Sequence, residues 1–253
     1  ELIKKNINII IVSSGAIAEG MNRLNLKKRP TSSSQLQALA AIGQMGLVKA
    51  YEIAFKKFNI TTAQMLLTHE DLSNRERYLN AKNTLNNLLK YNVIPIINEN
   101  DTVSTDEIKF GDNDTLASLV ANLSDAKSLV ILTDQNGLYS SDPRKSKDAK
   151  IIKKICVTNK NLNKYAGPSI NSLGRGGMIT KVIAAKKASK SNTQTIIANG
   201  TKKNILLKIL NEDDDIGTII SNKNSSINSK KQWIANSLKS KGEVIIDSGA
   251  ANA

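Results

Sequence analysis

Short apolar runs separated by polar loops form the main pattern along the chain. The run Ile7–Val12 is apolar except for Asn8 and rich in β-branched residues, and it ends at Ser13–Gly15, as a buried strand entering a tight turn does. Val93–Ile97 and Leu129–Leu132 are similar short runs that end in polar residues. We predict buried strands at all three, and further strands at Gln64–Thr68 and Thr195–Ala198.

Helical patterns lie between these runs. Ser34–Phe58 and Leu72–Tyr91 have helical composition, and Gly174–Gly177 lead into another expected helix that runs through Lys181 and Ala185. Asp112 can cap a helix whose apolar positions are spaced by three and four, namely Leu116, Leu119, Val120 and Leu123. Strands that alternate with helices predict an α/β protein with a parallel sheet, whose ligands bind at the carboxyl ends of the strands.

Composition fits one substantial core. The chain has 253 residues, of which 40% are hydrophobic and only 4% aromatic, so aliphatic side chains must build that core. The net charge of +14 raises nucleic acid or anionic lipid as partners. The basic residues are mostly scattered lysines, with short groups such as Lys27–Arg29, so we interpret them as a solvated surface and expect no nucleic acid partner.

Cys156 and His69 are the only cysteine and the only histidine. A single cysteine cannot form an internal disulfide, which suggests a reducing, cytoplasmic location. A single histidine excludes a metal site built from several histidines and makes a histidine-dependent catalytic triad improbable. No apolar stretch approaches the roughly 20 residues of a membrane span, so we expect no membrane partner.

Two polar segments are candidates for chemistry. The stretch Asn98–Asp114 is dense in carboxylates and amides directly after a predicted strand, which is costly unless a cation compensates the charge, although a plain surface loop is the alternative. Gly176 and Gly177 precede a helix whose N–H groups could hold phosphate, or they could form a simple turn. Lys181 lies about one turn later and could reach the same anion, or could simply be solvated.

Four blocks in order resemble the glutamate 5-kinases of the amino acid kinase family. They are "VSSGAIAEG" at Val12–Gly20, "INENDTVSTDEIKFGDNDTLASLVA" at Ile97–Ala121, "LTDQNGLYSSDPR" at Leu132–Arg144 and "GRGGMITK" at Gly174–Lys181. The run "QMLLTHEDLSNRERYLNAKNTL" at Gln64–Leu85 supports the likeness. The resemblance covers about Ile7–Gly217. It implies a three-layer αβα sandwich around a mainly parallel sheet.

The resemblance also implies a division of the chain. Residues 1–221 correspond to the kinase domain without its first strand, residues 222–242 to a linker, and residues 243–253 to the start of a truncated PUA domain. The family's first strand ends in a Lys-x-Gly-Ser/Thr turn, and nothing upstream of Ile7 matches it, since Lys4 and Lys5 are in a different context. We therefore expect the chain to be shortened at both ends.

The resemblance assigns residues to two subsites. Ser14, Gly15, Asp101 and Asn113 match glutamate-site positions, which agrees with the need of an ammonium group for a carboxylate and of a carboxylate for amide and hydroxyl donors. Lys181 and Asp114 match catalytic positions, Asp114 being the residue that orders the lysines. The nucleotide positions are Thr133, Asp134, Arg175, Gly176, Gly177, Met178, Ile179, Thr180 and Lys181. Arg175 stands where the family has a small hydroxyl residue.

The implied activity is transfer of the γ-phosphoryl group of ATP to the side-chain carboxylate of L-glutamate, the first step of proline biosynthesis, with Mg²⁺. A carboxylate is already ionised at neutral pH, so positioning and charge neutralisation suffice. The resemblance further implies a homo-oligomer and feedback by proline, and it implies no protein ligand for a metal. The alternatives are a kinase acting on aspartate or acetylglutamate, or a catalytically silent basic protein that binds nucleic acid.

Overall fold

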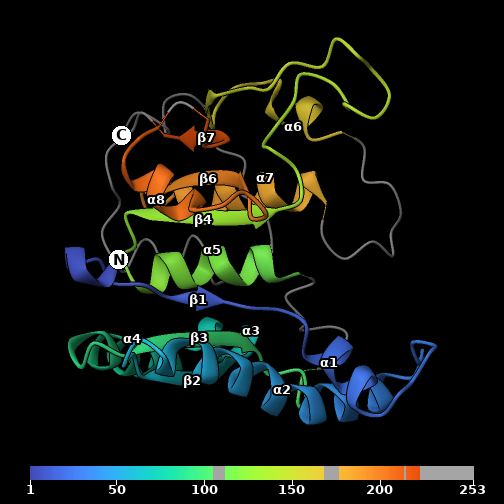
Figure 1. The fold of residues 1–253 in the computed structure, drawn as a ribbon, viewed down its shortest axis with the longest axis vertical. Coiled ribbons are helices and arrows are strands. Elements are labelled where there is room, and N and C mark those ends of the chain that lie inside the picture. The colour runs from blue at the N-terminus through green and yellow to red at the C-terminus, as the bar shows by residue number, and fades with distance from the viewer. Residues whose placement is uncertain (105–111, 168–176, 214, 223–253) are drawn as a thin grey trace, which may run out of the picture.

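The computed structural model describes residues 1–104, 112–167, 177–213 and 215–222. Within these ranges the strands form two sheets, and four of their five pairings are parallel. The predicted α/β class and mainly parallel pairing are confirmed. Figure 1 shows one sheet in the lower part of the molecule and the other in the upper part. None of the described helices combines the length and apolarity needed to cross a bilayer.

The first sheet has the order β1–β3–β2, all parallel. Its strands are β1 at Ile11–Val12, β2 at Thr62–Leu67 and β3 at Ile94–Glu99. The central strand β3 is buried along its whole length, as its continuous apolar run predicts. Strand β1 is shorter than the predicted Ile7–Val12, since only its last two residues pair with β3, and a short 3-10 helix, Ile3–Lys5, precedes it.

The second sheet has the order β4–β6–β7–β5, with β7 antiparallel to β6. Its strands are β4 at Ser128–Thr133, β5 at Lys154–Cys156, β6 at Gln194–Asn199 and β7 at Thr218–Ser221. Thr218 holds β7 in place because its buried Oγ1 accepts from the N–H of Leu138 (2.7 Å) and donates to the carbonyl of Ile152 (2.6 Å). Gly217 has φ 115°, and a Cβ there would lie 2.1 Å from the carbonyl oxygen of Ile197.

Helices cover both faces of the first sheet. One cluster joins β3 to α4 (Arg75–Lys90) and α5 (Asn113–Leu123), with Ile97 packed among Leu85 and Leu116. Side chains alternate along a strand, so Asn98 points to the opposite face, where it contacts Gln44 of α2 (Ser33–Lys56). The remaining helices are α1 at Ala16–Arg23, α3 at His69–Ser73, α6 at Leu162–Tyr165, α7 at Met178–Ser189 and α8 at Ile205–Leu210.

Helix α5 connects the two sheets. It contacts β1 and β3 of the first sheet, β4 of the second, and α7. Leu116 belongs to the core of the first sheet, whereas Ala121 packs with Leu129 of β4 and Ala184 of α7. Figure 1 shows α5 at a height between β1 and β4. A helix buried on several sides in this way fixes the position of the two sheets relative to each other.

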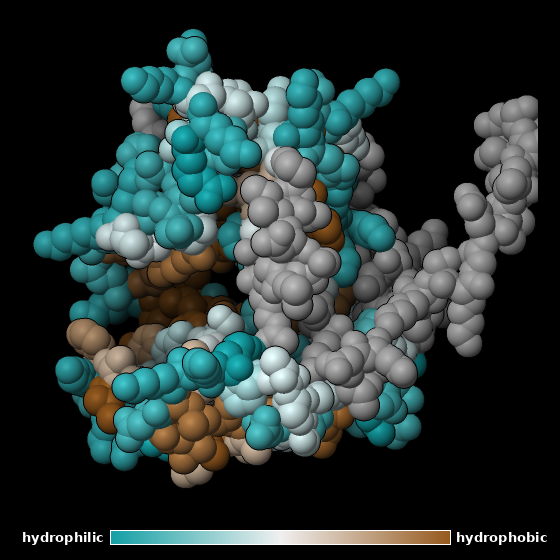
Figure 2. Space-filling view, turned by 90° about the vertical axis from the view of Figure 1, so that its right-hand side faces the viewer, coloured by the Kyte–Doolittle hydropathy of each residue, from teal (hydrophilic) through white to brown (hydrophobic). Residues whose placement is uncertain are grey.

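One sheet was predicted, and among the described residues there are two. Strands β1 and β4 end their sheets, and no described strand pairs with the outer edge of either. Figure 2 shows a hollow lined by hydrophobic residues between the two parts of the molecule. Apart from Asn222, the predicted linker at 222–242 and the predicted PUA segment at 243–253 lie outside the described residues.

Candidate active site

The carboxyl ends of β1 and β3 carry the predicted acceptor residues. Ser14 and Gly15 follow β1 and are exposed, and Gly15 takes φ 108° where α1 begins. This left-handed conformation suits glycine and lets the chain turn sharply from strand to helix. Asp101 lies in the turn after β3 and is partly exposed. The structure therefore places Ser14, Gly15 and Asp101 at the same end of the first sheet.

Asn113 reaches this end from the first position of α5. Its Nδ2 donates to Oδ1 of Asn98 (3.1 Å), the penultimate residue of β3. Asp112 caps the helix as predicted, because its Oδ1 accepts from the N–H of Thr115 (2.7 Å). Burial raises the pKa of the Asp112 carboxyl above its usual value, the cap hydrogen bond opposes this, and Asp114 adds to it.

Helix α2 supports the carboxyl end of the first sheet, called the acceptor end from here on, through three side chains. The sequence did not single out any of them. Gln37 Nε2 donates to the carbonyl of Ser104 (3.1 Å), Gln44 Oε1 accepts from Nδ2 of Asn98 (2.9 Å), and Tyr51 donates to Oγ of Ser13 (3.0 Å). The three are spaced by seven residues and so share one face of the helix. That spacing was the available signal, but polar residues on a helix more often face solvent.

Asp114 and Lys181 meet where α5 and α7 begin. Lys181 Nζ lies 3.0 Å and 3.3 Å from the two carboxylate oxygens of Asp114, and both side chains are about one-seventh exposed, at 14% and 15%. Thr180 Oγ1 also donates to Asp114 (2.7 Å) and accepts from the N–H of Gly177 (3.1 Å). The structure therefore brings together a cation and an anion that are 67 residues apart in the chain.

The predicted nucleotide residues lie in the second sheet and at the start of α7. Thr133 ends β4, and its hydroxyl donates to Asp134 (3.1 Å), which is exposed. Gly177 immediately precedes α7 and is exposed. Met178 and Ile179 open the helix and are partly buried, and Met178 packs against the core of the second sheet. Arg175 and Gly176 lie outside the described residues.

Magnesium has no protein cage in the described part of the chain. No group of three or more histidine, cysteine, aspartate or glutamate side chains there could hold a metal ion. Asp114, the carboxylate nearest the start of α7, is already paired with Lys181.

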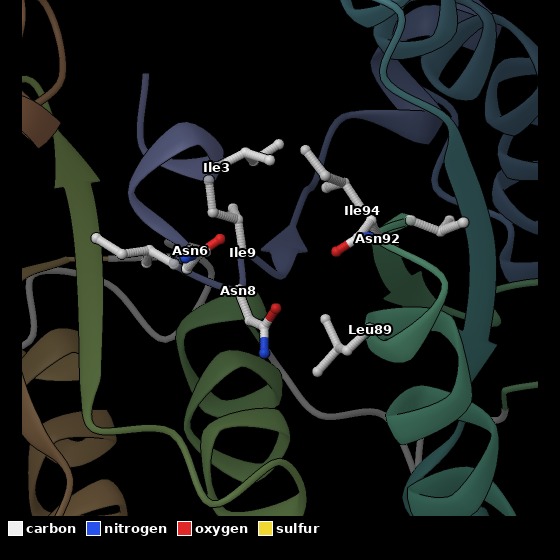
Figure 3. A pocket seen from close by; sticks show the side chains of 9 residues that line it. Ile3, Asn6, Asn8, Ile9, Leu89, Asn92 and Ile94 are labelled. Carbon is white, nitrogen blue, oxygen red and sulfur yellow. The ribbon is translucent and has the colours of Figure 1, made fainter.

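A pocket lies at the opposite end of the first sheet. It is formed by the segment before β1 and by the end of α4, with the start of β3 at one side. Figure 3 shows Asn6, Asn8 and Asn92 around it together with apolar side chains such as Leu89 and Ile94. Ligands of parallel sheets bind at the carboxyl ends of strands, and Ile94 is the first residue of β3, so this pocket is separate from the candidate site.

Comparison with known proteins gives consistent results. Residues 1–199 match the sequence profile of the amino acid kinase family. A glutamate 5-kinase of Nitrosospira multiformis is 53% identical over 253 residues, all of this chain and 68% of the relative. A glutamate 5-kinase of Hydrogenovibrio crunogenus is 52% identical over 252 residues, covering 67% of that relative.

A likeness to a solved structure supports the fold alone. The isopentenyl phosphate kinase of T. acidophilum aligns with a TM-score of 0.51 over 84% of this chain and 83% of that protein, at 16% identity. The profile match over residues 1–199 and the identity to relatives of which this chain covers about two thirds show more than the fold. The chain belongs to the amino acid kinase family, and within it to the glutamate 5-kinases.

Proposed function

We propose that this protein transfers the γ-phosphoryl group of ATP to the side-chain carboxylate of L-glutamate, giving L-glutamyl 5-phosphate for proline biosynthesis. The names of its relatives support the reaction. The observation that carries the proposal is the contact between Asp114 and Lys181, 3.0 Å, because it joins the end of the acceptor sheet to the predicted nucleotide helix. The two substrates of a direct transfer must meet at such a junction.

The acceptor site lies at the carboxyl end of the first sheet. Asp101 binds the α-ammonium group of glutamate, since a carboxylate complements that cation. Asn113 and Ser14 donate hydrogen bonds to carboxylate oxygens, and the turn at Gly15 lets the substrate approach the backbone. The partly exposed positions of Asp101 and Asn113 support this assignment, since a substrate must be able to reach them.

The nucleotide site lies at the end of β4 and the start of α7. Thr133 and Asp134 contact the nucleoside. The loop of Arg175, Gly176 and Gly177, with the N–H groups of Met178, Ile179 and Thr180, binds the phosphates at the positive end of the helix. The 12 residues of α7 and the exposure of Gly177 support this, because the first N–H groups of a helix have no partners within it.

Phosphoryl transfer then needs no covalent intermediate on the protein. A carboxylate oxygen of glutamate attacks the γ-phosphorus, a new P–O bond forms, and the bond to the leaving ADP oxygen breaks with its electron pair remaining on ADP. Lys181 neutralises charge on the transferring group, and Asp114 holds the Lys181 ammonium in place. Mg²⁺ bound to the phosphates supplies further charge neutralisation when present.

The proposal extends to assembly and regulation. We expect a cytoplasmic homo-oligomer under feedback by proline. Met45 and Ile53 of α2 and the nearby Phe58 are exposed by 73%, 52% and 73%. Large apolar side chains on an outer helix often become buried between subunits, which supports an oligomer.

A substrate panel tests the proposal. The protein is extended at its amino terminus by a strand that ends in Lys-x-Gly-Ser/Thr, because we expect the chain without that turn to be nearly inactive, and this extended protein is the unaltered reference in every kinetic measurement. It is incubated with ATP and Mg²⁺ together with glutamate, aspartate or N-acetylglutamate, and ADP release is measured. We expect release with glutamate only. Faster ADP release with aspartate or N-acetylglutamate would assign the kinase a different substrate. Salt-dependent retention of RNA without any ADP release would favour a catalytically silent protein that binds nucleic acid.

A further inference from the structure

Three side-chain amides form a hydrogen-bond chain that ends in the buried interior. Nδ2 of Asn113 donates to Asn98 (3.1 Å), and Nδ2 of Asn98 donates to Oε1 of Gln44 (2.9 Å). Asn98 is only 3% exposed and Gln44 9%. The chain runs from the surface of the acceptor site through β3 to helix α2.

The inner end of this chain has an unpaired donor. Nε2 of Gln44 is buried and has no hydrogen-bond partner among the described residues. Both N–H groups of this amide lack an acceptor in the observed direction, and buried N–H groups without an acceptor are rarer in proteins than carbonyl oxygens that lack a donor. The observed direction of the hydrogen bonds, from Asn113 to Asn98 and from Asn98 to Gln44, is therefore unfavourable at Gln44.

Rotating each amide by 180° reverses the chain without moving its heavy atoms, because amide nitrogen and oxygen have nearly the same shape. Gln44 then donates one N–H to Asn98, Asn98 donates to Asn113, and Gln44 is left with one unpaired N–H and an unpaired carbonyl oxygen instead of two unpaired N–H groups. In this direction both N–H groups of Asn113 point away from Asn98. An NH₂ group with two available donors suits a carboxylate.

We infer that Gln44 is a positioning residue that sets the direction of this amide chain, so that Asn113 presents both N–H groups to a carboxylate of the amino acid acceptor. The inference rests on the proposed function. Gln44 makes no contact with substrate in this arrangement and acts only through Asn98. Its neighbours on the same helix face, Gln37 and Tyr51, hold other parts of the acceptor end, which agrees with a supporting role for this face of α2.

Substitution at Gln44 tests the direction. Gln44→Glu places a carboxyl that only accepts once it is ionised, and since burial raises its pKa the kinetics are measured from neutral pH up to about pH 9. With the carboxylate ionised, Asn98 must donate to it and Asn113 must donate inward. We expect the KM for glutamate to rise about 10- to 100-fold, the loss of one hydrogen bond to a charged group, while the KM for ATP stays within about twofold. Gln44→Met adds no charge and leaves both directions open, so a smaller rise of about three- to tenfold is expected.

Gln35→Glu is the matched control, since Gln35 is exposed on the same helix, and its kinetics should equal those of the unaltered protein. A folded Gln44→Glu protein with an unchanged KM for glutamate, or with equal rises for glutamate and ATP, overturns the inference. If the buried carboxylate prevents folding, Gln44→Met decides by the same criteria. Absence of glutamate-dependent ADP release by the unaltered protein overturns the proposed function, and the inference with it.

Discussion

Replacing Lys181 by methionine separates its electrostatic role from its packing. Methionine keeps most of the aliphatic length and removes the ammonium group that lies 3.0 Å from Asp114. Loss of one charge-stabilising contact to a transition state costs about 3–4 kcal/mol, which lowers kcat by about 10²- to 10³-fold. Substrate binding is served mostly by other residues, so the KM values should change much less.

The same substitution affects stability, because Asp114 then keeps its charge without its partner. Breaking a fully buried pair costs about 3–5 kcal/mol and an exposed pair at most about 1 kcal/mol. With both side chains about one-seventh exposed, we expect a loss of about 1–3 kcal/mol, or a Tm lower by about 2–12 °C. Adding Asp114→Asn should recover part of this stability and none of the activity, since the unpaired carboxylate is removed but the ammonium group is not restored.

The assay is ADP release under saturating glutamate and ATP, with Tm measured by thermal unfolding of the same samples. Lys186→Met is the control, since Lys186 lies on the same helix and contacts Asn163 (2.8 Å) away from the site. A folded Lys181→Met protein with kcat within threefold of the unaltered protein would refute the reasoning. An equal loss of kcat in Lys186→Met would refute it as well, because removing any lysine from α7 would then have the same effect.

Four further predictions follow from other contacts. Asn113→Ala should raise the KM for glutamate far more than the KM for ATP, and an equal rise of both would contradict its role. Thr218→Val should lower the free energy of unfolding by about 2–4 kcal/mol in urea titrations, because Leu138 N–H loses its buried acceptor; Ser221→Ala is a control on the same strand. Burial raises the pKa of Asp112, so the stability that its carboxyl contributes is fully present below the usual value of 3.8 and is lost as pH rises through the raised pKa. Asp112→Asn keeps the cap, and its stability relative to the unaltered protein should increase over that window; a constant difference across pH would contradict this. Finally, an added amino-terminal strand ending in Lys-x-Gly-Ser/Thr should pair with β1 or β4, raising both Tm and kcat, and an unchanged Tm would count against it.

The elements that the sequence predicted are those whose pattern is long or strongly apolar. Helix α5 was predicted with its cap at Asp112, and β3 and β6 follow from continuous buried runs. Strands β5 and β7 were missed because they have three and four residues and depend on distant contacts, such as that of Thr218 with Leu138. Apolarity alone overestimated the length of β1. Residues Ile7–Ile10 have the composition of a strand, but no described strand pairs with them.

For the site, local chemistry predicted the residues that stand in polar loops and helix starts. Asp114 was singled out by resemblance, and Lys181 both by resemblance and by its place one turn after Gly177. Their contact became visible only in three dimensions. The contact of Gln44 with Asn98 could not be predicted, because it depends on which face of α2 packs against β3. A glutamine within a helix usually faces water, and only burial against Asn98 turns it into part of the acceptor end.

On the proposed function, the arrangement of α5 and α7 accounts for one ion pair serving both substrates. The helices run side by side in the same direction, since Asp114 meets Lys181 near their starts and Asn122 Nδ2 donates to the carbonyl of Lys187 (3.4 Å) near their ends. Their positive ends therefore converge on one region, which favours an anion there. In the protein alone, Asp114 provides that negative charge and holds Lys181 beside it. A transferring phosphoryl group would bring its own negative charge to the same place, so Lys181 can neutralise it with a small movement while Asp114 keeps the ammonium group from leaving. The proposal places acceptor and nucleotide at different sheets, and α5 holds those sheets at a fixed separation through its contacts with β1, β3 and β4.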